Sequence, residues 1–136
     1  MRKKIRTAAH STLDRRADLI RVEIGRRHPV DAADLPAALI YTDSEDQERG
    51  GMKKRHHAVD LKVSLYVKPD GQTAGEDDVD DLIEKIDPLL VASVAAVSGV
   101  YDVYPTGLDI DGDGEADADY LLATRTYAVE YESTEV

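Results

Sequence analysis

The most regular pattern in the chain is an alternation of apolar and polar side chains over residues 57–68. The apolar members occupy every second position: Val59, Leu61, Val63, Leu65 and Val67. Successive side chains of a strand point to opposite faces of a sheet, so this alternation predicts a strand with one face in the core and the other in contact with water or a partner. Shorter runs rich in β-branched or aromatic residues predict four more strands, at residues 19–26, 36–42, 100–104 and 120–132.

Two other segments carry apolar residues at helical spacing. In residues 3–17 the apolar positions form one stripe and Lys and Arg fill the outer side, which predicts an amphipathic helix with a cationic face. A second helix is expected to open at Thr73 and Glu76, which have the spacing of a capping box, and to end near Val97. Pro88 interrupts this second stripe, and an interior proline costs about 3 kcal/mol, so we expect a kink or a restart of the helix at that point.

The order helix, strand, strand, strand, helix, strand, strand predicts an α/β chain of the α+β type. We expect a mixed, mostly antiparallel sheet of about four to five strands, with the two helices packed on one face. Only the second helix offers a crossover long enough for a parallel pair. Residues 43–57 are polar and aperiodic, which predicts a mobile loop. A single domain over residues 1–136 is the organisation expected at this length.

The candidate chemistry argues against an enzyme. The chain has no cysteine, no Gly-x-Ser-x-Gly nucleophile elbow and no glycine-rich phosphate loop. His56 and His57 are neighbours at the start of a strand, so their side chains are expected on opposite faces and would not share a metal ion. We therefore expect no catalytic residues. The longest mainly apolar stretch, residues 89–97, is too short to span a membrane, so no membrane partner is expected either.

Charge is distributed unevenly along the sequence. Residues 1–30 carry a net charge of +6 and residues 70–136 a net charge of −16, within a total of −11. Such a split is compatible with solvated surfaces, or with complementary surfaces that bring copies of the chain together head to tail. The acidic remainder would repel DNA, so sequence-specific DNA binding is not expected. The candidate interface residues are the cations of the first helix: Arg2, Lys3, Lys4, Arg6, Arg15 and Arg16.

An aspartate-rich segment, residues 109–119, is the candidate metal site. Its carboxylates occupy relative positions 1, 3, 5 and 9 with glycine at position 6, as in a calcium-binding loop. Position 12, where a loop of the EF-hand type has a bidentate Glu, is Tyr120, so a solvated acidic turn remains the alternative. The candidate ligands for calcium or magnesium are Asp109, Asp111, Asp113 and Asp117.

Taken in order, these segments resemble the tail terminator proteins of long-tailed bacteriophages, the minor tail protein U family. The resemblance runs from the N-terminal helix through the acidic approach at residues 31–36 into the strand AALIYT, and on to the alternating strand AVDLKVSLYV. It continues with the acidic helix DDVDDLIEKIDPLL, including its proline, and ends with the closing strand RTYAVEYE.

The resemblance implies a structural role in the virion tail, after assembly in the bacterial cytoplasm. Such a protein is expected to form a homo-oligomeric ring, hexameric in this family, on the head-proximal end of the tail tube. The ring would stop addition of the major tail tube protein and would present a surface to the head–tail connector or head completion protein. DNA would pass through a negative lumen without specific binding. The family implies no active-site residues and requires no cofactor.

Within this picture the polar segment 43–57 is a candidate for contact with the tube. The residues proposed for that contact are Glu48, Arg49, Lys53, Lys54 and Arg55. Two alternatives stay open at this point: a calcium-binding module that works through residues 109–117, and a neighbouring neck or tail-completion protein with a similar small fold.

Overall fold

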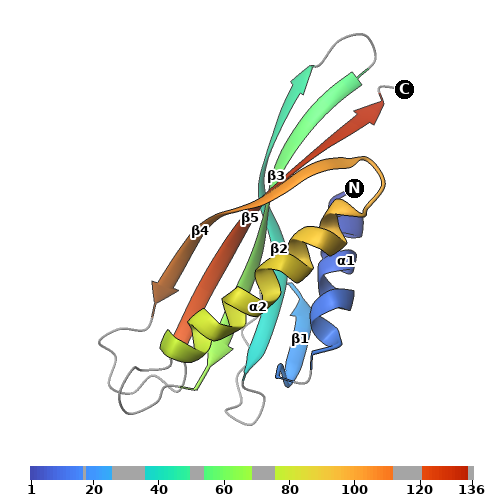
Figure 1. Cartoon of the computed structure of the whole chain (residues 1–136). Helices are drawn as coiled ribbons and strands as arrows, with labels where there is room; N and C mark the ends of the chain where they lie inside the picture. Colours follow the sequence, from blue (N-terminus) through green and yellow to red (C-terminus); the bar gives the residue numbers. More distant parts are fainter. Residues whose placement is uncertain (17, 26–35, 50–53, 69–75, 112–120, 135–136) are drawn as a thin grey trace.

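The computed structural model describes residues 1–16, 18–25, 36–49, 54–68, 76–111 and 121–134 (Figure 1). The described elements, in chain order, are α1 (Arg2–Asp14), β1 (Arg21–Ile24), β2 (Ala37–Arg49), β3 (Lys54–Val67), α2 (Glu76–Ala95), β4 (Val100–Asp111) and β5 (Leu121–Thr134).

The five strands form one mixed sheet in the order β1-β2-β3-β5-β4. Both helices lie on the same face of this sheet (Figure 1), so the predicted α+β architecture is confirmed. Strands β2, β3, β5 and β4 pair antiparallel, while β1 and β2 pair parallel. The expectation that only the second helix could join a parallel pair is wrong, because the parallel neighbours are joined through residues 25–36 instead.

The core lies between the sheet and the helices, and the alternation in β3 supplies its centre. All five apolar residues predicted to face the core are at most 1% exposed. They pack with buried side chains of both helices and of β5. These are Ile5, Ala9 and Leu13 of α1, Val79, Ile86, Leu90 and Val94 of α2, and Leu121, Ala123, Tyr127 and Val129 of β5. The predicted amphipathic stripes of both helices therefore form the inner side of the helix layer.

The other face of the sheet also contains a buried cluster. Ala37, Leu39 and Tyr66 are at most 2% exposed, and Leu122 packs against them. Tyr66 lies on the face opposite to Leu65 and Val67, which the alternation predicts to contact water or a partner, and it is buried there. Ser64, two residues earlier, is also buried and its hydroxyl lies 3.2 Å from that of Thr124 on β5. At this end of the sheet, side chains on both faces are therefore buried.

The predicted loop at residues 43–57 is wrong for the part that the structure describes. Strand β2 continues to Arg49 and β3 starts at Lys54, and the two pair from Glu45 opposite Val59 to Arg49 opposite Arg55. A register shift between Thr42 and Glu45 marks where the regular ladder is interrupted. The polar sequence is typical of a loop, but backbone pairing with neighbouring strands gives these residues strand conformation.

Two further elements differ from the prediction. Strand β4 runs to Asp111 rather than ending at Tyr104, and it includes Pro105. A proline is tolerated there because β4 is an edge strand, which pairs only with β5. Helix α2 is continuous over Pro88, so it does not restart there.

Gly99 makes the turn from α2 into β4 and has a φ of +96°. A Cβ at this position would also lie 2.9 Å from the side-chain methyl of Met1. We expect Gly99→Ala to lower the free energy of unfolding by about 1 kcal/mol, because an L side chain is strained in this backbone region. Urea unfolding measures the change. Gly107→Ala, which adds a Cβ into open space, is the control, and an equal loss in both variants would contradict the explanation.

Candidate subunit interface

The candidate interface cations on the first helix fall into two groups. Arg6 donates to the hydroxyl of Thr42 at 2.7 Å, and Arg16 pairs with Asp18 through two hydrogen bonds of 2.8 and 2.7 Å. The positive charge of Arg2 acts on Glu45 of β2. These three cations are directed partly toward their own chain.

The other three cations are Lys3, Lys4 and Arg15. All three are exposed, and within the described parts of the chain none of them forms an ion pair. Lys3 and Lys4 lie away from the buried stripe of Ile5, Ala9 and Leu13, as the helical period predicts, and Arg15 is the C-cap residue that follows α1. We call Lys3, Lys4 and Arg15 the cationic helix face.

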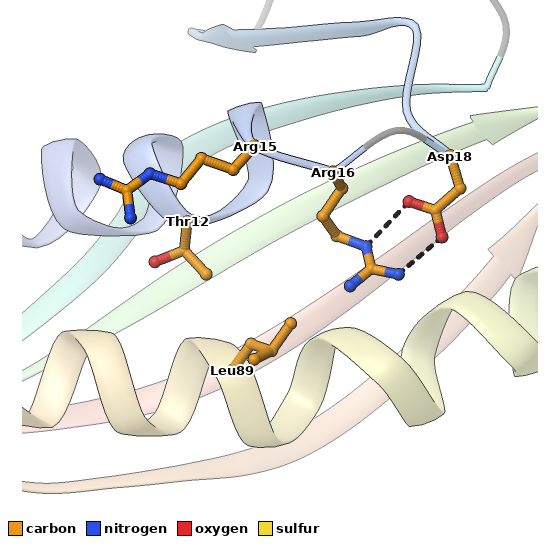
Figure 2. Close-up of a pocket in the computed structure, with 5 residues that line it drawn as sticks. All are labelled: Thr12, Arg15, Arg16, Asp18 and Leu89. Carbon is orange, nitrogen blue, oxygen red and sulfur yellow. Dashed lines mark hydrogen bonds and ion pairs between the residues drawn. The ribbon is translucent and has the colours of Figure 1, made fainter.

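A groove lies between the C-terminal end of α1 and the middle of α2. It has a volume of about 590 Å³ and is lined by Thr12, Arg15, Arg16, Asp18 and Leu89. Figure 2 shows Leu89 rising from α2 toward the groove while the guanidinium of Arg16 is held by Asp18. Leu89 is 42% exposed. The groove therefore combines an exposed leucine with cations, a composition suited to a partner with apolar and acidic groups.

The β2–β3 hairpin carries the residues proposed for contact with a tail tube. Its outer ends and the end of β5 reach beyond the two helices (Figure 1). Glu48, Lys54 and Arg55 are exposed on these strand ends, and Arg49 is the last residue of β2. Lys53 lies outside the described residues.

A buried cluster fixes the base of this hairpin. His57 is 8% exposed, stacks on Tyr131 with ring centroids 4.5 Å apart, and its Nε2 lies 2.6 Å from the hydroxyl of Ser133. The hydroxyl of Tyr131 donates to Glu45 on β2. Desolvation and this hydrogen bond raise the pKa of Tyr131. The alternation of β3 places His57 on the same face as Val59 and Leu61, so the sequence could have indicated that this histidine is the buried one of the pair.

A second cluster joins α2 to the sheet. Arg125 of β5 donates to both carboxylate oxygens of Asp87 at 3.1 and 2.6 Å, and the hydroxyl of Tyr127 donates to the same carboxylate at 2.5 Å. Burial and the neighbouring carboxylate raise the pKa of Tyr127, which keeps its hydroxyl a hydrogen-bond donor. The sequence pattern gave no indication of this cluster, because the three residues are far apart along the chain.

The acidic candidate metal site lies largely outside the described residues. Asp109 and Asp111 belong to β4, so the predicted loop is wrong for residues 109–111. Asp113 and Asp117 are not among the described residues. Within the described segments, no three His, Asp or Glu side chains come close enough to hold a metal ion. In those segments there is also no helix with the length and apolar content needed to cross a membrane.

Stability is expected to fall in acid through two of these carboxylates. The hydrogen bonds from Arg16 lower the pKa of Asp18 below its ordinary 3.8. Burial opposes ionisation of Glu45, but hydrogen bonds from Tyr131 and Gln47 hold its pKa below the ordinary 4.5. A carboxyl whose folded pKa is depressed stabilises the folded state above its unfolded pKa, and this contribution is lost as the pH falls through the folded pKa.

We therefore expect the free energy of unfolding to decline as the pH falls below about 4.5. Urea unfolding between pH 7 and pH 3 measures this decline. The variant Asp18→Asn with Glu45→Gln should be less stable at pH 7 and should show a shallower decline. An unchanged slope in that variant would assign the acid sensitivity to other groups.

Comparisons with known proteins give a fold but no family. No protein-family model and no curated protein matches the sequence. Among solved structures, the chain is similar to one chain of a structure described as the virion of a native gene transfer agent (GTA) particle. The TM-score is 0.53 at 12% sequence identity, and the match covers 96% of each chain. At this identity the similarity shows a shared fold.

Proposed function

We propose that the chain is a structural protein of a phage-like virion and acts as a tail terminator. In this role, copies assemble head to tail into a six-membered ring on the end of the tail tube, stop its growth and offer a surface to the head connector. The proposal assigns no catalytic step to the protein.

One observation carries the proposal: the fold is shared with a chain from a virion particle over 96% of both chains. A match of this extent concerns the whole arrangement of sheet and helices rather than a common motif. The segment pattern that resembles tail terminators points to the same class of protein, independently of the coordinates.

The distribution of charge supports assembly of identical copies. The cationic helix face belongs to the first helix, whereas residues 70–136 carry a net charge of −16. A ring requires heterologous contacts, in which one surface of a subunit meets a different surface of the next. Surfaces of opposite sign on one chain provide such a pair and steer copies toward the productive orientation.

The β2–β3 hairpin supports contact with a tube. Its strand ends extend past the helix layer (Figure 1), and they carry exposed charges on both faces, including Glu48, Lys54 and Arg55. An arm of this kind can reach a neighbouring protein without disturbing the core.

Tail-tube polymerisation in the presence of the purified chain tests the proposal. The tail tube protein encoded in the same genome is polymerised with increasing amounts of the chain, and tube lengths and end labelling are measured by electron microscopy. We expect shorter tubes with label at one end only. Unchanged tube lengths with no label at either end would overturn the proposal, and binding to purified head connector alone would favour a neck protein.

The hairpin variant Lys54→Glu with Arg55→Glu locates the tube contact in the same assay. We expect it to remain folded by circular dichroism and to lose tube binding. Asp80→Lys with Glu84→Lys changes two exposed residues of α2 and serves as the control that should still bind. Normal end labelling by the hairpin variant would remove the hairpin from the contact.

A further inference from the structure

One face of the sheet has no described helix over it, and the outer part of that face is acidic. Both helices lie on the opposite face (Figure 1). The side chains concerned come from all four antiparallel strands: Asp46 and Glu48 of β2, His56 of β3, Glu130 and Glu132 of β5, and Tyr101, Asp102 and Tyr104 of β4. We call this surface the acidic sheet face.

The strand register places these carboxylates in two rows across the sheet. In one row Asp46, Ala58, Glu130 and Asp102 are successive cross-strand neighbours, so Glu130 and Asp102 lie directly opposite each other. In the next row His56 lies between Glu48 and Glu132. Like charges directly opposite on neighbouring strands destabilise a sheet. The isolated chain therefore holds an unfavourable concentration of negative charge on this face.

Of the described residues that can carry positive charge, β3 places Lys54, His56 and Lys62 on this face, against the five carboxylates of the two rows. The Nδ1 of His56 lies 3.4 Å from Glu132. Lys62, further along β3, pairs with Asp43 at 3.8 Å. Desolvation and the negative charges around it raise the pKa of Tyr101, as expected in a negative potential.

Two exposed tyrosines give the acidic sheet face an apolar centre. Tyr101 is 53% exposed and Tyr104 is 43% exposed. The ring of Tyr101 meets that of His56 edge to face, with centroids 6.1 Å apart, so the tyrosine is already positioned before any partner binds. Tyrosines surrounded by charged residues are typical of the centre of a protein–protein interface.

The complementary surface is on the other side of the same molecule. The cationic helix face consists of Lys3, Lys4 and Arg15, and the groove beside it exposes Leu89. Because the helix layer and the acidic sheet face are separated by the sheet, the two surfaces cannot meet within one chain. They can meet only between copies, and such a contact is heterologous.

We infer that the acidic sheet face binds the cationic helix face of a second copy of this chain. The inference rests on the proposed function and specifies the contact that repeats around its ring. In this contact, Lys3, Lys4 and Arg15 of one copy approach Glu130, Glu132 and Asp102 of the next, and Tyr101 and Tyr104 pack toward the Leu89 groove. The acidic sheet face of each copy is thereby covered in part by the first helix of a neighbour.

Charge reversal with mixing tests this pairing. The first variant carries Lys3→Glu, Lys4→Glu and Arg15→Glu, and the second carries Asp102→Lys, Glu130→Lys and Glu132→Lys. Each variant alone brings like charges together at every contact, so we expect the concentration for half-maximal assembly to rise by about a hundredfold or more. An equimolar mixture places opposite charges at every contact again and should form alternating rings of three and three.

Assembly is measured by light scattering on the free protein and by end labelling of tail tubes, and folding by circular dichroism. The matched control for the second variant is Asp77→Lys with Asp80→Lys and Glu84→Lys, which makes the same change in net charge on the exposed side of α2 and should assemble normally. The inference is overturned if the folded single variants assemble like the wild type, or if their mixture does not assemble.

The controls separate this inference from the proposed function. If the wild type forms rings and ends tubes while both charge variants do the same, the function stands and the pairing is wrong. If the wild type neither assembles nor binds tubes, the proposed function and the pairing fail together. If the variant with Asp102→Lys, Glu130→Lys and Glu132→Lys loses binding only to another protein while rings persist, the acidic sheet face belongs to that partner and the pairing is wrong.

Discussion

Replacing Leu61 by alanine is expected to lower the free energy of unfolding by about 3 kcal/mol, the middle of the range for deletion of a buried leucine side chain. Leu61 is 0% exposed at the centre of β3, where its backbone neighbours are Thr42 on β2 and Tyr127 on β5. Both flanking strands and the helix layer would have to move inward to fill the cavity, and packed sheets relax only partly. Chemical unfolding with circular dichroism measures the loss.

Ile20→Ala is the matched control for this prediction. Ile20 is 61% exposed, so its truncation should change the free energy of unfolding by no more than about 0.5 kcal/mol. A comparable loss in the two variants would mean that the sheet is not packed around β3 as described.

Replacing Asp87 by alanine is expected to cost about 2 kcal/mol, less than the loss of one partner from a fully buried ion pair, because its ion pair with Arg125 is only partly buried. The change leaves the guanidinium of Arg125, whose side chain is 18% exposed, without its carboxylate. It also leaves the hydroxyl of Tyr127, a fully buried residue, without its acceptor. The loss is larger than that of a surface ion pair because the Tyr127 hydroxyl stays buried without a partner and the Arg125 guanidinium is largely shielded from water.

Two further variants in the same unfolding experiment measure the contribution of the Tyr127 hydrogen bond and provide a surface control. Tyr127→Phe removes only one hydrogen bond and should cost about 1 kcal/mol. Asp80→Ala, at an exposed position of α2, should leave stability within about 0.5 kcal/mol of the wild type. If Asp87→Ala were as mild as Asp80→Ala, the cluster would not hold α2 on the sheet.

The elements with a clear hydrophobic period could be predicted from the sequence. The alternation around Leu61 and the helical stripe of α1 both reflect burial of one side, so the pattern and the structure have the same cause. The same reasoning predicted that His56 and His57 lie on opposite faces, and the structure confirms it: His57 is buried and His56 is half-exposed.

The outer hairpin could not be predicted in this way. Residues 45–49 and 54–57 are mainly polar because this part of the sheet extends beyond the helices, so burial leaves little pattern in the sequence. The predicted strand at residues 100–104 ends before Pro105, whereas β4 continues to Asp111, and the reason is related. Whether a proline ends a strand depends on whether the strand is at an edge, and that is a property of the whole sheet.

The candidate interface was predictable in part. Helical periodicity identified the cations of α1, but only the coordinates separate the exposed Lys3, Lys4 and Arg15 from those held by their own chain. The acidic sheet face depends on the register between four strands. No local sequence signal brings Asp102 next to Glu130.

The number of copies in the assembled form is the most direct test of whether the chain forms a six-membered ring. Multi-angle light scattering on the purified chain over a wide concentration range, with calcium, with magnesium and with EDTA, gives this number for the free protein. Calibrated fluorescence counting of labelled chains gives it at tube ends. We expect a closed assembly of six copies, in solution or at one end of each tube, whose size does not grow with concentration. A chain that stays monomeric at every concentration and is absent from tube ends would contradict it.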